Sequence, residues 1–272
     1  MVVLSDITIG QFFPGNSVLH RLDPRVKLVL VFSYILAVFI PDNWLGLALA
    51  VVLLVVSVGL SHIPPKVLLK GLKPVVPLLL FTSLINIFYV QGRILVEFWI
   101  FKITAEGIYT AIFIAIRIFC LIAAGSLLTY TTSPTSLTDG LERVMNPLKV
   151  LRVPVHEIAM MMTIALRFIP TLIEETDKIM SAQKSRGADM ESGNLLQRVK
   201  ALIPVLVPLF VSSFRRAYDL ATAMECRCYH GGEGRTRLKQ FRMQITDYVA
   251  VVVMCLLVAL MIATNVFLPK VL

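Results

Sequence analysis

Residues 108–130 read IYTAIFIAIRIFCLIAAGSLLTY, and this apolar run carries a single charged residue, Arg117. Because the hydrocarbon core of a bilayer is roughly 30 Å thick, a helix of about 20 mostly apolar residues is needed to cross it. Four further stretches have the same character, at 26–40, 44–61, 74–90 and 246–268. The sequence therefore predicts an all-α, polytopic membrane protein with about five transmembrane helices.

The overall composition supports a membrane location. Of the 272 residues, 57% are hydrophobic and only 16% are charged, which is more apolar than a soluble domain of this length requires. The net charge of +9 comes mainly from residues 131–245, which hold most of the lysines and arginines. Since basic loops stay on the cytoplasmic side, this segment is expected in the cytoplasm, and the charge gives no reason to expect a nucleic-acid partner.

Residues 131–245 contain two long helical patterns. The first runs from Val155 to about Arg186 and the second from Leu195 to about Tyr229, and glycines follow each of them. Each pattern is apolar in its first half and polar in its second half. We therefore expect a cytoplasmic pair of long helices, preceded at 131–154 by a short amphipathic helix along the membrane face. The predicted divisions are 1–130 with four spans, 131–245 with the helix pair, and 246–272 with the last span.

Each long pattern ends in an arginine that lies between two small residues. The two triplets are Ser185, Arg186, Gly187 and Cys226, Arg227, Cys228. Residues on the same helical face one to two turns earlier also match in kind: Ile179, Ala182 and Gln183 in the first pattern, and Leu220, Ala223 and Met224 in the second.

Two interpretations of these arginines are possible. A basic residue near a helix C-terminus gains about 0.3 to 1 kcal/mol from the helix dipole without any partner, and Asp189 or Glu225 could pair with the arginines locally. Alternatively, an accessible guanidinium offers a planar donor fork for a carboxylate of another protein. Because the helix dipole requires neither the alanine nor the small neighbours, their repetition on two helices favours a pair of matched docking tips.

Several longer stretches surround these triplets, namely FFPGNSVLHRLDPRVKL at 12–28, ALRFIPTLIEE at 165–175, LIPVLVPLFVSSFRRAYDLATAME at 202–225 and GGEGRTR at 231–237. With them, nearly the whole chain resembles the transmembrane coupling component of energy-coupling factor importers of vitamins and metal ions. That family has two Ala-Arg-Gly-like triplets at the ends of paired coupling helices. Here serine and cysteine replace the alanines, and Cys228 stands where glycine or serine is commoner; all of these residues are small.

The resemblance implies a non-catalytic subunit of an ATP-driven importer. Two cytoplasmic ATPase subunits of the ABC type would dock at the arginine triplets, and a membrane-embedded substrate-binding subunit would contact the membrane-facing helices. Closure of the ATPases on ATP would then reorient the substrate-binding subunit. The resemblance also implies a multi-pass protein of a prokaryotic plasma membrane. Because Arg21, Arg25 and Lys27 precede the first span, we expect the N-terminus in the cytoplasm and, with five spans, the C-terminus outside.

The chain itself offers little catalytic chemistry. It lacks the GxxxxGK[ST] phosphate-binding motif, so ATP is expected on the partner subunits, with no cofactor and no catalytic residue in this chain. A CxCxH cluster is formed by Cys226, Cys228 and His230. On a continuing helix Cys228 would point away from the other two, so a metal site is not expected. A disulfide framework is not expected either, because the cysteines fall in spans or on the reducing cytoplasmic side.

Other functional classes remain as alternatives. A stand-alone secondary transporter or channel would show inverted repeats with charges at matching midplane positions, whereas the only such charge found is Arg117. An integral membrane enzyme would need a convergent set of acids, bases or metal ligands within the spans. Arg117 is either part of a transport path or subunit contact, or it is satisfied inside the bundle by carbonyls or by polar groups such as Asn86.

Overall fold

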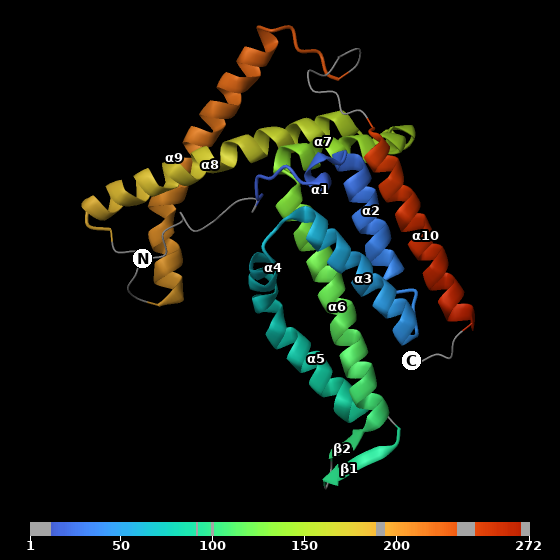
Figure 1. Ribbon diagram of the computed structural model, residues 1–272. Coiled ribbons are helices and arrows are strands. Elements are labelled where there is room, and N and C mark those ends of the chain that lie inside the picture. Colours follow the sequence, from blue (N-terminus) through green and yellow to red (C-terminus); the bar gives the residue numbers. More distant parts are fainter. Residues whose placement is uncertain (1–11, 91, 99–100, 189–193, 233–242, 268–272) are drawn as a thin grey trace. The chain divides into compact units, whose positions relative to one another are not determined.

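The computed structural model describes residues 12–90, 92–98, 101–188, 194–232 and 243–267. Helices dominate this part of the chain, and one antiparallel hairpin of two short strands lies between α5 and α6 (Figure 1). In chain order the elements are α1 (Val18–Arg21), α2 (Pro24–Ala37), α3 (Trp44–Ser61), α4 (Pro65–Leu72), η2 (Lys73–Val75), α5 (Val76–Tyr89), β1 (Ile94–Phe98), β2 (Phe101–Thr104), α6 (Ala105–Thr131), α7 (Pro134–Val144), η3 (Asn146–Leu151), α8 (Val155–Ser185), α9 (Leu195–Glu225) and α10 (Ile245–Phe267).

The prediction of an all-α polytopic membrane protein is confirmed. Six helical segments in the described part are long and apolar enough to cross a membrane: α3, the continuous segment Pro65–Tyr89, α6, α8, α9 and α10. Four of the predicted spans fall within this set. The first predicted span corresponds to α2, which has only 14 residues and is not in the set. This helix ends at Ala37 because the amides of Phe39 and Ile40 bond three residues back, tightening the turn before Pro41.

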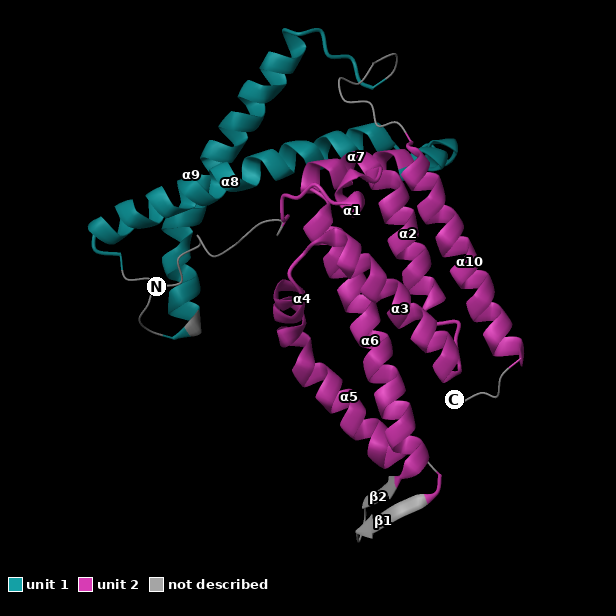
Figure 2. Cartoon of the chain, in the orientation of Figure 1, with its two compact units in different colours: residues 1–9, 144–239 teal, residues 10–143, 240–272 magenta. Residues whose placement is uncertain are grey.

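The chain forms two compact units, which are described separately (Figure 2). The first, here called the membrane bundle, comprises Gly10–Arg143 and Gln240–Leu272. The second, here called the coupling unit, comprises Val144–Lys239 together with Met1–Ile9. The coupling unit is therefore an insertion, for the most part, between α7 and the last helix of the membrane bundle.

Small residues bring the helices of the membrane bundle close together. Ala37 and Ala50, from α2 and α3, are almost fully buried, as are Ala123 and Ala124 of α6. Without a large side chain the helix backbones approach closely, which is how helices associate where the surrounding lipid is as apolar as the core. The Tyr34 hydroxyl donates to the Ala50 carbonyl over 2.9 Å and ties α2 to α3.

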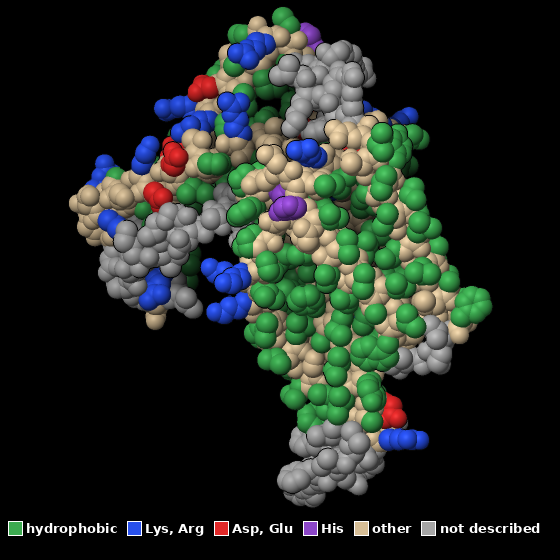
Figure 3. Space-filling model, in the orientation of Figure 1, with side chains coloured by type: hydrophobic (Ala, Val, Ile, Leu, Met, Phe, Trp, Pro, Cys, Tyr) green, Lys and Arg blue, Asp and Glu red, His purple; other side chains and the backbone are tan. Residues whose placement is uncertain are grey.

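The outer surface of the membrane bundle is strongly apolar (Figure 3). Large side chains such as Leu80 on α5 and Leu256 on α10 are 67% and 65% exposed. A water-soluble monomer rarely exposes a continuous apolar surface of this kind, whereas lipid chains solvate it without cost. The structure thus agrees with the composition in placing these helices in a bilayer.

Polar contacts join the C-terminal end of α10 to the turn between α2 and α3. The Asn265 amide donates to the Ile40 carbonyl over 2.6 Å, and its carbonyl oxygen accepts the Asp42 amide over 2.9 Å. Asn43 adds a 2.9 Å bond to the Thr264 carbonyl. These bonds satisfy backbone groups in the turn between α2 and α3, so α10 is fixed there by directional contacts as well as by packing.

Candidate functional site

The candidate site is built on the two long helices of the coupling unit, which cross one another (Figure 1). Both α8 and α9 remain helical for 31 residues. Pro170 lies inside α8, and Pro204 and Pro208 lie inside α9, although an internal proline removes a backbone hydrogen bond. The helices cross where the Arg216 guanidinium meets the Glu175 carboxylate at 2.8 Å.

The polar half of α8 ends in a complete C-cap. The Ala188 amide donates to the Gln183 carbonyl over 3.0 Å, and the Gly187 amide donates to the Lys184 carbonyl over 3.0 Å. These two bonds form a Schellman motif, which requires a left-handed residue after the helix. Gly187 supplies it with φ of +86°, so Arg186 is held at the capping position between the helix and the turn.

The polar half of α9 ends in the same way. The Tyr229 amide donates to the Met224 carbonyl over 3.1 Å, and the Cys228 amide donates to the Glu225 carbonyl over 2.8 Å. Cys228 takes the left-handed conformation with φ of +54° in the place of Gly187. Arg227 therefore occupies the capping position that Arg186 occupies on α8. We call these two helix ends the tips of the coupling unit.

Both arginines are accessible at the tips. Arg186 and Arg227 are exposed, and all four small neighbours, Ser185, Gly187, Cys226 and Cys228, are exposed as well. Among the described residues neither arginine forms an ion pair, although Glu225 lies two positions before Arg227. Asp189, the other acid considered as a local partner, lies outside the described residues. The geometry leaves both guanidinium groups free to take a carboxylate from outside.

The residues of the predicted supporting face divide into two kinds. Ala182 and Ala223 are exposed, so a partner can approach the helix backbone there. The other four are half-buried: Ile179, Gln183, Leu220 and Met224. The Gln183 side chain donates to the Pro204 carbonyl of α9 over 3.4 Å and so contributes to the contact between the helices. It therefore has an internal partner that the face pattern did not predict.

The described residues place no group of potential metal ligands at the tips. Cys226, Cys228 and His230 are exposed, and no three histidine, cysteine or acidic side chains of the described residues converge as metal ligands.

Arg117, the charge within the apolar run 108–130, finds two partners inside the membrane bundle, although its Nε is buried without a hydrogen-bond partner. Its guanidinium donates to the Pro41 carbonyl over 2.5 Å and lies 4.9 Å from the centre of the Phe113 ring. A backbone carbonyl and an aromatic face are the expected partners of an arginine in an apolar setting. Asn86 instead donates to Thr82 on its own helix.

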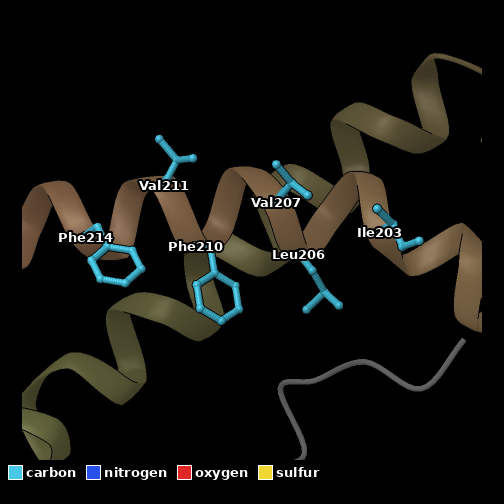
Figure 4. Close-up of a pocket in the computed structure, with 6 residues that line it drawn as sticks. All are labelled: Ile203, Leu206, Val207, Phe210, Val211 and Phe214. Carbon is cyan, nitrogen blue, oxygen red and sulfur yellow. The ribbon is translucent and has the colours of Figure 1, made fainter.

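An apolar groove on α9 was not singled out by sequence reasoning (Figure 4). It has a volume of about 620 Å³, and the side chains that line it follow one another along the helix: Ile203, Leu206, Val207, Phe210, Val211 and Phe214. They are between 48% and 70% exposed, and Phe210 and Phe214 stack with their centroids 6.2 Å apart. The apolar half of the helix was visible in the sequence. The sequence did not show that this face of α9 is exposed, because that depends on which helices pack against it.

These features define a class: a polytopic α-helical membrane protein that carries a crossed helix pair with arginine-capped ends. Comparison with known proteins gives the family. The model of the cobalt transport protein family CbiQ matches residues 15–238. The energy-coupling factor transporter transmembrane protein EcfT of Ruminiclostridium cellulolyticum is 55% identical over 88% of this chain and 90% of its own. The proteins of the same name from Thermosediminibacter oceani and Clostridium kluyveri are 51% and 49% identical, over 91% and 98% of this chain and 93% and 100% of their own.

The chain belongs to the family of energy-coupling factor transporter transmembrane proteins.

Proposed function

We propose that this protein is the non-catalytic coupling subunit of an ATP-driven importer of vitamins or metal ions. Two cytoplasmic ABC ATPase subunits dock on the tips, one at Arg186 and one at Arg227. A membrane-embedded substrate-binding subunit packs against the apolar surface. ATP is bound and hydrolysed by the partners, and α8 and α9 transmit their closure.

The observation that carries this proposal is the equivalence of the two tips. The same pair of capping hydrogen bonds places an exposed arginine at the end of each helix. Two equivalent donors suit two copies, or two close relatives, of one partner that offers a carboxylate. A guanidinium fixed at a rigid helix end loses little conformational freedom on binding, which favours a directional ion pair.

The groove on α9 supports the proposed contact with the substrate-binding subunit. Its six apolar side chains lie on the helix that also carries Arg227, so a partner seated there would respond to movement of the tip. Such an uncovered face suits a helix of another membrane protein. Substrate chemistry then belongs to that partner.

Charge reversal at the tips tests the proposal. Arg186→Glu and Arg227→Glu place a like charge opposite the expected carboxylate, and each should weaken retention of the cognate ATPase subunits by at least about tenfold. Arg215→Glu makes the same charge change at an exposed position near the helix crossing and serves as the matched control. The measurement is the amount of ATPase that co-purifies with the tagged chain. Normal retention by the double tip variant would refute the docking assignment.

A further inference from the structure

Two of the chain connections between the coupling unit and the membrane bundle lead into helices of the membrane bundle that the structure describes. One follows α6, which ends at Thr131, and continues through α7; the other precedes α10, which begins at Ile245. Force that the coupling unit exerts along these two parts of the chain reaches the membrane bundle through α7 and through the start of α10. Near each of them a buried charged side chain makes a bond between this part of the chain and the start of α2: Lys27 bonds to the end of α6, and Asp247 bonds from the first turn of α10.

The outgoing connection is held by Lys27, a residue of the first turn of α2 that is only 6% exposed. Its ammonium donates to the Thr131 carbonyl over 3.0 Å and to the Thr132 hydroxyl over 3.3 Å. A third bond, of 3.3 Å, reaches the His20 carbonyl at the end of α1. Carbonyls at helix C-termini lack partners within their own helix and carry partial negative charge, so a buried cation binds them well.

The returning connection is held by Asp247, in the first turn of α10, which is 1% exposed. One carboxylate oxygen accepts the Gln244 amide over 2.7 Å, and the other accepts the Asp23 amide over 2.9 Å. Asp23 is itself the N-cap of α2. A single carboxylate thus ties the start of α10 to the start of α2, across 224 positions of the sequence.

Lys27 and Asp247, here called the anchor pair, act on one another as well. The negative charge of Asp247 attracts the Lys27 ammonium, and each charge lies in surroundings that water barely reaches. Hydrogen bonds made by ionised groups in such surroundings are stronger than neutral ones, so these contacts resist being pulled apart.

Lys27 also lines an apolar cavity of about 430 Å³, which raises the alternative that it binds a ligand. Its three donors already have three acceptors, in His20, Thr131 and Thr132. An ammonium group has no further donor to offer, so the hydrogen bonding favours an internal role.

We infer that Lys27 and Asp247 are positioning residues that couple movement of α8 and α9 to the membrane bundle, by fixing both chain connections to the first turn of α2. This inference rests on the proposed function, because it assigns the anchor pair a part in the transmission between ATPase and substrate-binding subunits. Without the anchor pair, the C-terminus of α6 and the N-terminus of α10 would move independently of α2. Closure of the ATPases would then shift only these two helix ends and would not move the membrane bundle as a whole.

The test uses the complete importer, with this chain, its ATPase subunits and its substrate-binding subunit in proteoliposomes. Labelled B vitamins and labelled cobalt ion are offered, and the probe used is the one that the wild-type importer accumulates. In Lys27→Met and Asp247→Asn the amount of probe imported per ATP hydrolysed should fall about fivefold or more, while the ATPase subunits co-purify as in the wild type. The double variant Lys27→Met/Asp247→Asn, which leaves no unpaired buried charge, should assemble better than either single variant yet remain uncoupled.

Asn265→Ala is the matched control, because it removes polar contacts between α10 and the α2–α3 turn without touching either connection. It should lower thermal stability but leave the import per ATP unchanged. Three outcomes would overturn the inference. The import per ATP could be unchanged in the anchor variants, it could fall equally in Asn265→Ala, or all three anchor variants could fail to assemble. Normal ATPase retention by the tip variants, or a wild type that imports no probe, would instead count against the proposed function.

Discussion

Glu175 and Arg216 face each other at 2.8 Å where α8 and α9 pack together, and they occupy equivalent positions on the two helices. Glu175 precedes Arg186 by the same number of residues as Arg216 precedes Arg227. The crossing point is therefore equally far from both tips along the chain. The two arginine-capped ends therefore lie the same number of residues beyond this ion pair.

Exchanging the charges at the crossing tests how much the ion pair contributes. The Arg216 side chain is 42% exposed and that of Glu175 is 21% exposed, so solvent screens their attraction. We expect Arg216→Ala to reduce the free energy of unfolding by only about 0.2 to 1 kcal/mol. The double variant Glu175→Arg/Arg216→Glu should recover part of the lost free energy of unfolding. Thermal unfolding in detergent at low and high salt measures the effect, and a loss that persists in high salt would contradict an electrostatic origin.

The conformations of Gly187 and Cys228 predict opposite effects of substitution at the tips. A side chain at Gly187 would have open space around it, so Gly187→Val acts only through the left-handed backbone with φ of +86°. That conformation costs an ordinary residue about 1 to 2 kcal/mol, and Cys228 already bears such a cost with φ of +54°.

Hydrogen exchange at the capping amides measures this difference. Protection of the Ala188 amide should fall in Gly187→Val, and protection of the Tyr229 amide should rise by about fivefold in Cys228→Gly, which corresponds to about 1 kcal/mol. Equal exchange in the variants and the wild type would show that the caps do not depend on these two residues.

Two glycines of α6 provide a matched pair for packing in the membrane bundle. A methyl group on Gly107 would lie 2.9 Å from the Ile87 carbonyl oxygen and 3.0 Å from that of Asn86, whereas one on Gly125 would meet nothing within 4 Å. We expect Gly107→Ala to destabilise the fold by about 1 to 3 kcal/mol through overpacking. Gly125→Ala should instead stabilise it by about 0.5 to 1 kcal/mol through helix propensity. Denaturation in detergent compares the two, and the same sign in both would contradict this account of the α5–α6 contact.

Substitution of Arg117 separates a structural role from a transport role. Arg117→Met removes the bond to the Pro41 carbonyl and the contact with Phe113, so it should lower stability by about 1 to 3 kcal/mol. Import by the assembled complex should remain. Arg117→Lys keeps a charge at the same depth and serves as the comparison. Import that survives in Arg117→Lys but is abolished in a well-folded Arg117→Met complex would place Arg117 on the transport path.

The sequence alone was sufficient for the local features of this protein. Apolar runs predict spanning helices because the length of a helix and the thickness of a bilayer are fixed quantities. The end of α8 was visible for a similar reason, because glycine after a helical pattern is typical of a C-cap. The second pattern was expected to run to about Tyr229, but α9 ends at Glu225 because Cys228 takes the left-handed conformation that Gly187 takes after α8. Boundaries were less accurate where helices run on, as in the continuous segment Pro65–Tyr89, of which only 74–90 was predicted.

Only the tertiary structure decided the contacts between distant parts of the chain. Nothing in the neighbourhood of Asp23 indicates that its amide meets Asp247, and nothing near Ile40 indicates Asn265. Helix periodicity places a side chain on a face, but it does not say which helix covers that face. The partner of a buried polar group is chosen when the helices pack, because an unsatisfied donor or acceptor in an apolar interior costs more than the backbone adjustments that satisfy it.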